Sequence, residues 1–247
     1  MHIYSSLCDD FGTFCYLMTE LPFPTNRETV LSFFEAVQKE FPQLRQFYAR
    51  ESGEFVLEQE KTDGAYASVT LELRRLGCGY HNPTAFSEVD TLVERVLELA
   101  PYYLNLSPLD LDAVDVSFAF DLIYNGNHDA VVLEALGTAP WMEGLLHVPE
   151  AKVLNYQPAL TLSLDETYRL QCRLQIETRT TTYQVRTGEY HDEPISVYFT
   201  VRQYRHGEPI KNLPETYRRL REDGRELVEQ YVIPQVVRPL AQAIGAK

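Results

Sequence analysis

The sequence predicts an α+β fold, mainly an antiparallel sheet with helices packed on it. The first half has the order β-α-β-β-α-β, and the second half is rich in strands. A long amphipathic segment near the C-terminus predicts a helix that packs on the sheet. No Gly/Ser-rich or Pro-rich linker divides the chain, so we expect a single α+β unit over residues 1–247, with possible subdomains 1–125 and 126–247.

In the first half, aromatic content and alternating apolar residues predict strands at residues 12–19, 54–58, 67–76 and 114–122. Asp63-Gly64 is a turn signal between the second and third of these. One helix is expected to begin at Thr25, where Thr25 and Glu28 have capping-box spacing, and to end at Pro42. A second is expected from Ser87 to Pro101.

In the second half, alternation predicts strands at residues 160–164, 170–176 and 195–201, and a Thr-rich piece of high β propensity lies at 178–185. The C-terminal helix is expected over residues 213–232. Pro234 should interrupt or kink it, and residues 236–244 could form a last short helix.

Composition argues against several functions. The formal net charge is −14, which repels phosphate backbones, so we expect no direct nucleic-acid binding. No apolar run reaches the roughly 18 residues that a membrane helix needs, and the first residues do not resemble a signal peptide. The four cysteines form no Cys-x-x-Cys pair, which is typical of thiols in a reducing compartment. A soluble bacterial-type cytoplasmic protein is the expectation.

Three short sequence features of low specificity indicate a resemblance to a known group of proteins. Phe41-Pro42 ends the first helix, Ile123-Tyr124-Asn125 ends the strand at mid-chain, and a strand over 197–204 precedes the C-terminal helix. In these features the chain resembles an uncharacterised, sporadically distributed group of bacterial proteins of similar length. The chain departs from that group at Asp115 and Asp121, where basic residues are usual. The resemblance implies the order of elements, and it implies no reaction, cofactor or catalytic residue.

Gly126-Asn127-His128-Asp129 matches an active-site signature of calcineurin-like metallophosphoesterases. That chemistry needs two metal ions held by carboxylates and histidines from several loops. The companion motifs Asp-x-His, Gly-Asp-x-x-Asp and Gly-His-x-His do not occur in the sequence. We therefore interpret the stretch as a turn that ends a strand, with Asn127 or Asp129 capping the helix that follows.

Other polar stretches are weaker candidates. His191 and Asp192, like His128 and Asp129, could contact a ligand or metal, but Gly188 and Pro194 favour an exposed hairpin tip there. The Asp-x-Asp at Asp110 and Asp112 lacks a phosphate cradle and is interpreted as a loop. The segment Cys78-Gly79-Tyr80-His81 is interpreted as a turn at a strand end rather than a nucleophile with its base. We accordingly predict no catalytic residue, no cofactor and no metal.

Large apolar residues in connecting segments are the remaining signal. Exposed, they would form an interaction surface, and buried, they would seal the helices onto the sheet. The residues concerned are Tyr102, Tyr103, Trp141, Met142, Leu145 and Leu146.

The function expected from the sequence is a non-enzymatic binding or assembly module that engages a protein partner or itself. The alternative is a protein with a cavity for a small apolar ligand, or an unrecognised hydrolase. An apolar surface patch would favour the first, and a pocket with convergent polar groups would favour the second.

Overall fold

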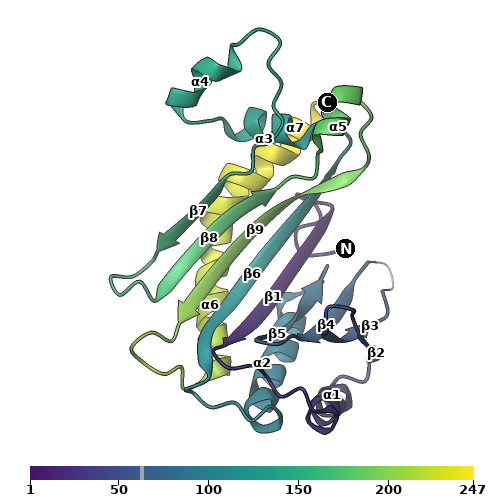
Figure 1. Cartoon of the computed structure of the whole chain (residues 1–247), viewed down its shortest axis with the longest axis vertical. Helices are drawn as coiled ribbons and strands as arrows, with labels where there is room; N and C mark the ends of the chain where they lie inside the picture. Colours follow the sequence, from purple (N-terminus) through teal and green to yellow (C-terminus); the bar gives the residue numbers. More distant parts are fainter. Residues whose placement is uncertain (62–63) are drawn as a thin grey trace.

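The chain folds around one curved antiparallel sheet of nine strands, ordered β2-β3-β4-β5-β1-β6-β9-β8-β7 (Figure 1). This computed structural model describes residues 1–61 and 64–247. The α+β fold predicted from the sequence is confirmed, including the long C-terminal helix on the sheet. The strands are β1 (Asp10–Thr19), β2 (Leu44–Ala49), β3 (Phe55–Gln59), β4 (Tyr66–Leu71), β5 (Arg75–His81), β6 (Leu111–Tyr124), β7 (Ala159–Ser163), β8 (Leu170–Glu177) and β9 (Glu193–Tyr204).

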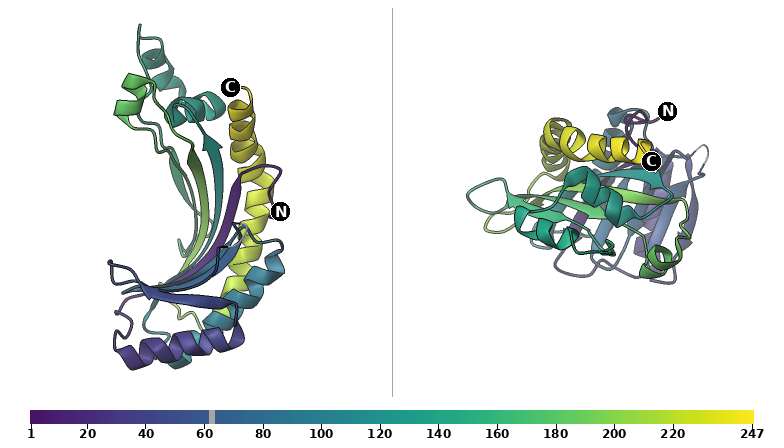
Figure 2. Two further views of the ribbon diagram at one scale, coloured as in Figure 1. Left: turned by 90° about the vertical axis from the view of Figure 1, so that its right-hand side faces the viewer. Right: turned by 90° about the horizontal axis from the view of Figure 1, so that it is seen from above.

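Helices cover only the convex face of the sheet (Figure 2). They are α1 (Arg27–Glu40), α2 (Phe86–Tyr103) and a C-terminal helix made of α6 (Leu213–Leu227), η1 (Val228–Val237) and α7 (Arg238–Gly245). Three shorter helices, α3 (His128–Leu136), α4 (Pro140–Leu146) and α5 (Thr182–Thr187), lie at one end of the sheet (Figure 1). None of the helices in the described part of the chain is both long and apolar enough to span a membrane.

The core lies between the convex face and these helices. The alternation predicted for residues 114–122 is confirmed, because Val114, Val116, Phe118, Phe120 and Leu122 of β6 are all buried. On α6, Tyr217 and Leu220 are also buried, and the Tyr217 hydroxyl donates to Asp90 of α2 at 2.8 Å. That hydrogen bond joins the two helices over the middle of the sheet.

Between α1 and α2 the structure contains four strands where the sequence predicted two. Residues 67–76 were expected as one strand, but the chain reverses there, and β4 pairs with β5 as a hairpin. The Glu72 N–H donates to the Arg75 carbonyl at 2.8 Å in this turn, and Leu73 is 62% exposed. An uninterrupted alternation therefore hid a turn with no Gly, Pro or Asn in it. Strand β2 was also missed. Asp63 of the predicted turn lies outside the described residues.

Residues 78–81 were expected to form a turn at the end of a strand. They instead belong to the inner strand β5, which pairs with both β1 and β4. Glycine normally weakens a strand, so the sequence Gly77-Cys78-Gly79 concealed it. In the structure, a Cβ at Gly79 would lie 2.2 Å from the Thr13 carbonyl oxygen and 2.8 Å from the Phe14 ring. The glycines are therefore needed because β1 places its aromatic rings against this strand.

The helix ends and the Thr-rich segment also differ from what the sequence predicted. The N-cap of α1 is Asn26, which accepts from the Thr29 N–H at 2.9 Å, so the expected start at Thr25 was one residue early. Helix α2 begins before Ser87 and runs through Pro101. Residues 182–187 form the short helix α5, because Thr181 and Gln184 make a capping box that outweighs the β propensity of the segment. The C-terminal helix continues through Pro234 as the π-helical turn η1, which relieves the clash between a proline ring and the preceding turn.

A close approach at Gly224 sets the distance between α6 and the sheet. A Cβ at this position would lie 2.7 Å from the Phe118 ring and 3.2 Å from Val201. Phe118 is fully buried, so its ring is enclosed by the core. We predict that Gly224→Ala lowers the free energy of unfolding by about 1 kcal/mol or more, because overpacking outweighs the higher helix propensity of alanine.

Urea denaturation measures this difference, and Gly144→Ala in α4 is the matched control. A Cβ at Gly144 would meet nothing within 4 Å, so this substitution should leave stability unchanged or slightly raised. Equal effects of the two substitutions would show that the contact with Phe118 does not limit the packing of α6.

Candidate functional site

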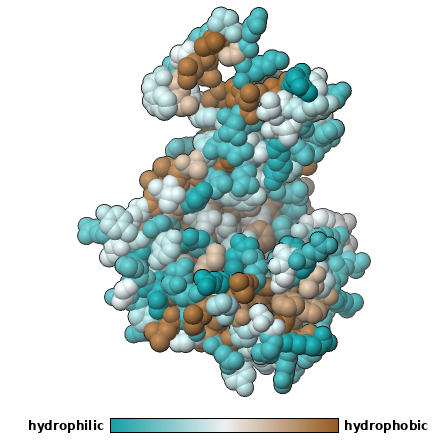
Figure 3. All heavy atoms as spheres, viewed as in Figure 1, coloured by the Kyte–Doolittle hydropathy of each residue, from teal (hydrophilic) through white to brown (hydrophobic). Residues whose placement is uncertain are grey.

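The concave face of the sheet is the candidate functional site, since no helix of the described chain covers it (Figure 2). Three adjoining hollows of about 580, 320 and 280 Å³ lie on this face and at its lower end. Arg75 lines all three, and Tyr16 lines the second and third. We call these hollows together the concave groove. Figure 3 shows the recessed middle of this face and the hydrophobic residues gathered below it.

Arg75 lies at the centre of the groove because the β4–β5 turn places it there. Its Nε donates to Glu72 Oε1 at 2.8 Å, and a terminal guanidinium nitrogen contacts the same oxygen. The guanidinium also lies over the Tyr16 ring, 5.0 Å from the ring centre. The side chain is still 43% exposed, so one side of the guanidinium remains open to a ligand.

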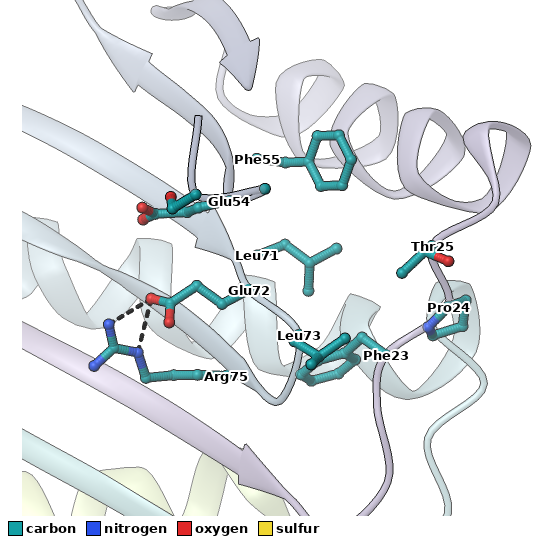
Figure 4. A pocket seen from close by; sticks show the side chains of 11 residues that line it. Phe23, Pro24, Thr25, Glu54, Phe55, Leu71, Glu72, Leu73 and Arg75 are labelled. Atoms are coloured by element: carbon teal, nitrogen blue, oxygen red, sulfur yellow. Dashed lines mark hydrogen bonds and ion pairs between the residues drawn. The ribbon is translucent and has the colours of Figure 1, made fainter. Parts of the chain in front are cut away.

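The largest hollow gives the groove an apolar end (Figure 4). Phe23, Phe55, Leu71 and Leu73 gather on one side of it, while Glu72 and Arg75 point away from them on the other. Only a few residues thus separate a hydrophobic contact area from an ion pair. A ligand that fits here presents an apolar group next to a polar one.

A continuous run of four rings lies on the concave face, and three of them, Phe14, Tyr16 and His81, line the second hollow. Tyr66 stacks on His81 with ring centres 4.3 Å apart, Phe14 meets the edge of His81 at 4.8 Å, and Tyr16 lies 6.2 Å from Phe14. We call Tyr66, His81, Phe14 and Tyr16 the aromatic row. The Phe14 and Tyr16 rings lie directly against β5, because a Cβ at Gly79 would be 2.8 Å from Phe14 and one at Gly77 would be 3.0 Å from Tyr16. Burial raises the pKa of Tyr16 to about 12, so its hydroxyl stays protonated at neutral pH.

Two acidic residues of β6 face the groove, each paired with β9. Asp115 lies opposite Arg202, whose Nε and a terminal nitrogen donate to its two carboxylate oxygens at 2.6 and 2.5 Å. Asp121 accepts from the Ser196 hydroxyl, to which Arg179 donates at 2.9 Å. Burial raises the pKa of both carboxyl groups, and the hydrogen bonds oppose that shift. These are the positions at which the sequence departs from the resembling group.

Charges in the groove are nearly balanced, although the whole chain carries −14. The second and third hollows are lined by five carboxylates and four guanidinium groups: Asp10, Glu54, Glu72, Asp115, Asp121, Arg50, Arg75, Arg173 and Arg202. Most of these carboxylates have a partner, as with Glu54 and Arg50 at 3.0 Å or Asp10 and Asn82 at 2.6 Å. Shape and hydrogen bonding, rather than net charge, therefore determine what this surface can bind.

The four weak polar candidates of the sequence, His128, Asp129, His191 and Asp192, do not line the groove. His128 and Asp129 are buried at the start of α3. His128 Nε2 lies 3.0 Å from the Tyr124 carbonyl oxygen, and Asp129 accepts from the Tyr156 N–H and the Thr178 hydroxyl. Asn127 caps the helix by accepting from the Ala130 N–H at 3.0 Å, which confirms the interpretation of Gly126-Asn127-His128-Asp129 as a turn and cap.

His191 and Asp192 are exposed ahead of β9, where Asp192 accepts from Asn125 at 3.0 Å. This pair is thus exposed, whereas His128 and Asp129 are buried. Within residues 1–61 and 64–247, no three His, Cys, Asp or Glu side chains are grouped so that they could hold a metal ion. Burial raises the pKa of Cys78 to about 12, so this thiol is protonated and is not an activated nucleophile.

The apolar residues of the sequence analysis lie in two separate places. Tyr102 is 80% exposed and Tyr103 half-buried at the end of α2, while α4 carries Trp141 (79% exposed), Met142 and Leu145 (65% exposed). These helices lie at opposite ends of the molecule (Figure 1). The concave groove itself was missed, because its aromatic residues come from β1, β4 and β5, and only the tertiary pairing brings them together.

The chain matches no protein-family model, and no curated protein matches it at a significant level.

His81 should make stability depend on pH. Burial and then the nearby Lys61 lower the pKa of His81 to about 4, whereas the unfolded value is 6.5. As pH falls below 6.5, the unfolded chain binds a proton that the folded protein resists, so stability decreases until about pH 4. We predict a loss on the order of 2 to 3 kcal/mol across this window.

Urea denaturation at a series of pH values tests this, with His81→Phe as the comparison because it keeps a ring on Tyr66. The difference in unfolding free energy between wild type and variant should vary between pH 6.5 and 4 and stay flat above 7. A difference that does not change with pH would contradict the prediction.

Replacing only Arg202 of the Asp115–Arg202 pair should destabilise the protein more than replacing both residues with apolar ones. Asp115 is 3% exposed, so Arg202→Met leaves a buried carboxylate without its counter-charge. We expect Arg202→Met to lower the free energy of unfolding by about 3 kcal/mol at neutral pH. The double variant Asp115→Leu/Arg202→Met should recover most of that loss, and a double variant as unstable as the single one would refute this account.

Proposed function

We propose that the protein is a non-enzymatic binding module that acts through protein–protein contacts, and that its concave groove receives a segment of a partner protein. The observation that carries this proposal is the continuity of the groove through Arg75, from the apolar end to the aromatic row and the Asp115–Arg202 pair. An extended polypeptide can place apolar side chains in one hollow and polar groups in the next. Aromatic residues and arginine are also the side chains that contribute most at protein interfaces.

The state of the polar groups favours binding over catalysis. A general base or nucleophile needs a lone pair that can reach a substrate and a pKa near the working pH. In the groove, Asp115 and Asp121 direct their oxygens to Arg202 and Ser196, and Tyr16 keeps its proton. These side chains are arranged to hold one another in place and so give the surface a fixed shape.

A small apolar ligand is the second candidate, and it is favoured by one hollow. The apolar end, at about 580 Å³, has the size of a small-molecule pocket, and Phe23, Phe55, Leu71 and Leu73 would contact such a ligand. This ligand would not reach Tyr16 or the third hollow, which Leu73 does not line. The two candidates therefore differ in which residues matter.

Peptide display tests the proposal. Linear peptides selected on the wild-type protein should bind it in calorimetry, and Arg75→Ala and Leu73→Asp should each weaken binding about tenfold or more, as expected for central interface residues. Trp141→Ala in α4 is the control and should leave the affinity unchanged. Circular dichroism confirms that each variant is folded.

Two outcomes would contradict the proposal that a partner segment binds in the concave groove. Selected peptides that bind Arg75→Ala as well as wild type would place the binding surface elsewhere. An affinity that responds to Leu73→Asp and ignores Arg75→Ala would favour the small apolar pocket.

A further inference from the structure

The outer edge of the sheet at β7 has properties that a free edge strand rarely combines. All five residues of β7 are exposed, and its pairing with β8 has no bulge. From Asn155 to Leu164 the chain contains no charged residue, although the protein carries −14 overall. Proteins usually protect an exposed edge with charges, proline or bulges, because its unpaired N–H and C=O groups would otherwise pair with another strand.

The direction of the backbone groups in β7 follows from its pairing with β8. The Leu164 N–H donates to the Leu170 carbonyl at 2.7 Å, and the Ile176 N–H donates to the Pro158 carbonyl at 3.0 Å. Hydrogen-bonded pairs alternate along an antiparallel ladder, so Leu160 and Leu162 also point their backbone groups toward β8. Ala159, Thr161 and Ser163 therefore direct their N–H and C=O groups outward, and no described residue bonds to them.

The side chains of the same strand are apolar on one face only. Leu160 and Leu162 are 56% and 48% exposed, and Leu164, which follows them with the same alternation, is 38% exposed. They share their face with Cys172 and Leu174, on the convex side that the C-terminal helix leaves uncovered at this edge (Figure 2). Thr161 faces the opposite side and lines the third hollow of the concave groove.

We infer that β7 pairs antiparallel with β7 of a second copy of this chain, around a two-fold axis at Thr161. In this register Thr161 lies opposite Thr161 of the other copy, and Ala159 lies opposite Ser163. These are the residues whose N–H and C=O groups point outward, so each pair exchanges two hydrogen bonds. Leu160 then lies opposite Leu162 of the other copy, and the leucines of both strands form one apolar cluster on the convex side.

A second copy is the occupant that the self-complementary sequence of this edge favours. Two molecules that each carry −14 repel one another over most of their surfaces, but residues 155–164 are uncharged, so pairing along β7 brings no like charges into direct contact. The other edge strand, β2, contains Arg45 and is followed by Arg50, so its edge is charged. A two-fold interface must also be complementary to itself. The alternation of Leu160, Thr161 and Leu162 meets this requirement, because the axis at Thr161 places each leucine opposite a leucine of the other copy. The pairing brings the two grooves next to each other across the axis, since Thr161 of each copy lines the third hollow of its own groove.

Cysteine cross-linking tests the register. Across the axis, the Cα atoms of residue 161 would lie about 5.5 Å apart, within reach of a disulfide. Thr161→Cys should therefore form an intermolecular disulfide on mild oxidation. Ser163→Cys should not, because its two copies would be offset by four residues, or about 13 Å. The native cysteines are all buried and give little background. Cross-linking of both variants to the same low extent, or of Ser163→Cys alone, would overturn the inference.

A proline substitution tests the dimer itself. The Thr161 N–H points away from β8, so Thr161→Pro removes an interface hydrogen bond and leaves the ladder inside the molecule intact. Light scattering after size exclusion should show a dimer for wild type and a monomer for Thr161→Pro, with an unchanged circular dichroism spectrum. Ala49→Pro on β2 is the matched control, since its N–H points outward at the opposite edge, and it should remain a dimer.

A wild-type monomer at all concentrations, or a Thr161→Pro dimer, would refute the β7 interface. This result is independent of the proposed function, because peptide binding in the groove depends on Arg75 and is measured on either form. A monomer that binds peptides through Arg75 would thus overturn the dimer alone.

Discussion

The contact between Phe118 of β6 and Gly224 of α6 sets the spacing on which the rest of the structure depends. It brings the C-terminal helix down onto the central strands, so the convex face of β6 and β9 is buried and the sheet is left with one open side. A bulkier residue at position 224 would move the helix outward and expose apolar side chains that now form the core. Because the helices pack on the convex face, the concave face is in contact with water or a ligand.

The polar side chains of the concave face are stable there because they are arranged in pairs across strands. Asp115 and Arg202 face each other in the β6–β9 register, and Asp121 faces Ser196 six residues further along β6. Burying a charge without a partner is costly, and such pairs remove most of that cost while fixing the orientation of each side chain. The aromatic row achieves the same rigidity with rings, since glycines in β5 let Phe14 and Tyr16 lie directly against the neighbouring strand. A surface that is rigid before binding loses little conformational entropy when a partner arrives.

Two features of the same sheet thus have separate roles in the proposed activity. The groove centred on Arg75 offers side chains to a partner, and the β7 edge offers backbone hydrogen bonds to a second copy. Thr161 belongs to both, through its side chain and its backbone respectively. Dimerisation would double the number of grooves on one continuous concave surface, and a partner with two binding segments would then be held more firmly than by either groove alone.

The sequence by itself determined the elements whose signals are local: the alternation in β6, β8 and β9, the amphipathic C-terminal helix, and the turn and cap at Asn127. It also indicated that Gly126-Asn127-His128-Asp129 lacked the companions of a metal site. Only the tertiary structure decided that residues 75–81 form a central strand, because their glycines are explained by the rings of β1 and not by any neighbour in the sequence. The groove depends on the same long-range pairing: Tyr16, Arg75 and Arg202 are far apart in the chain, and hydrogen bonding between strands places them on one face.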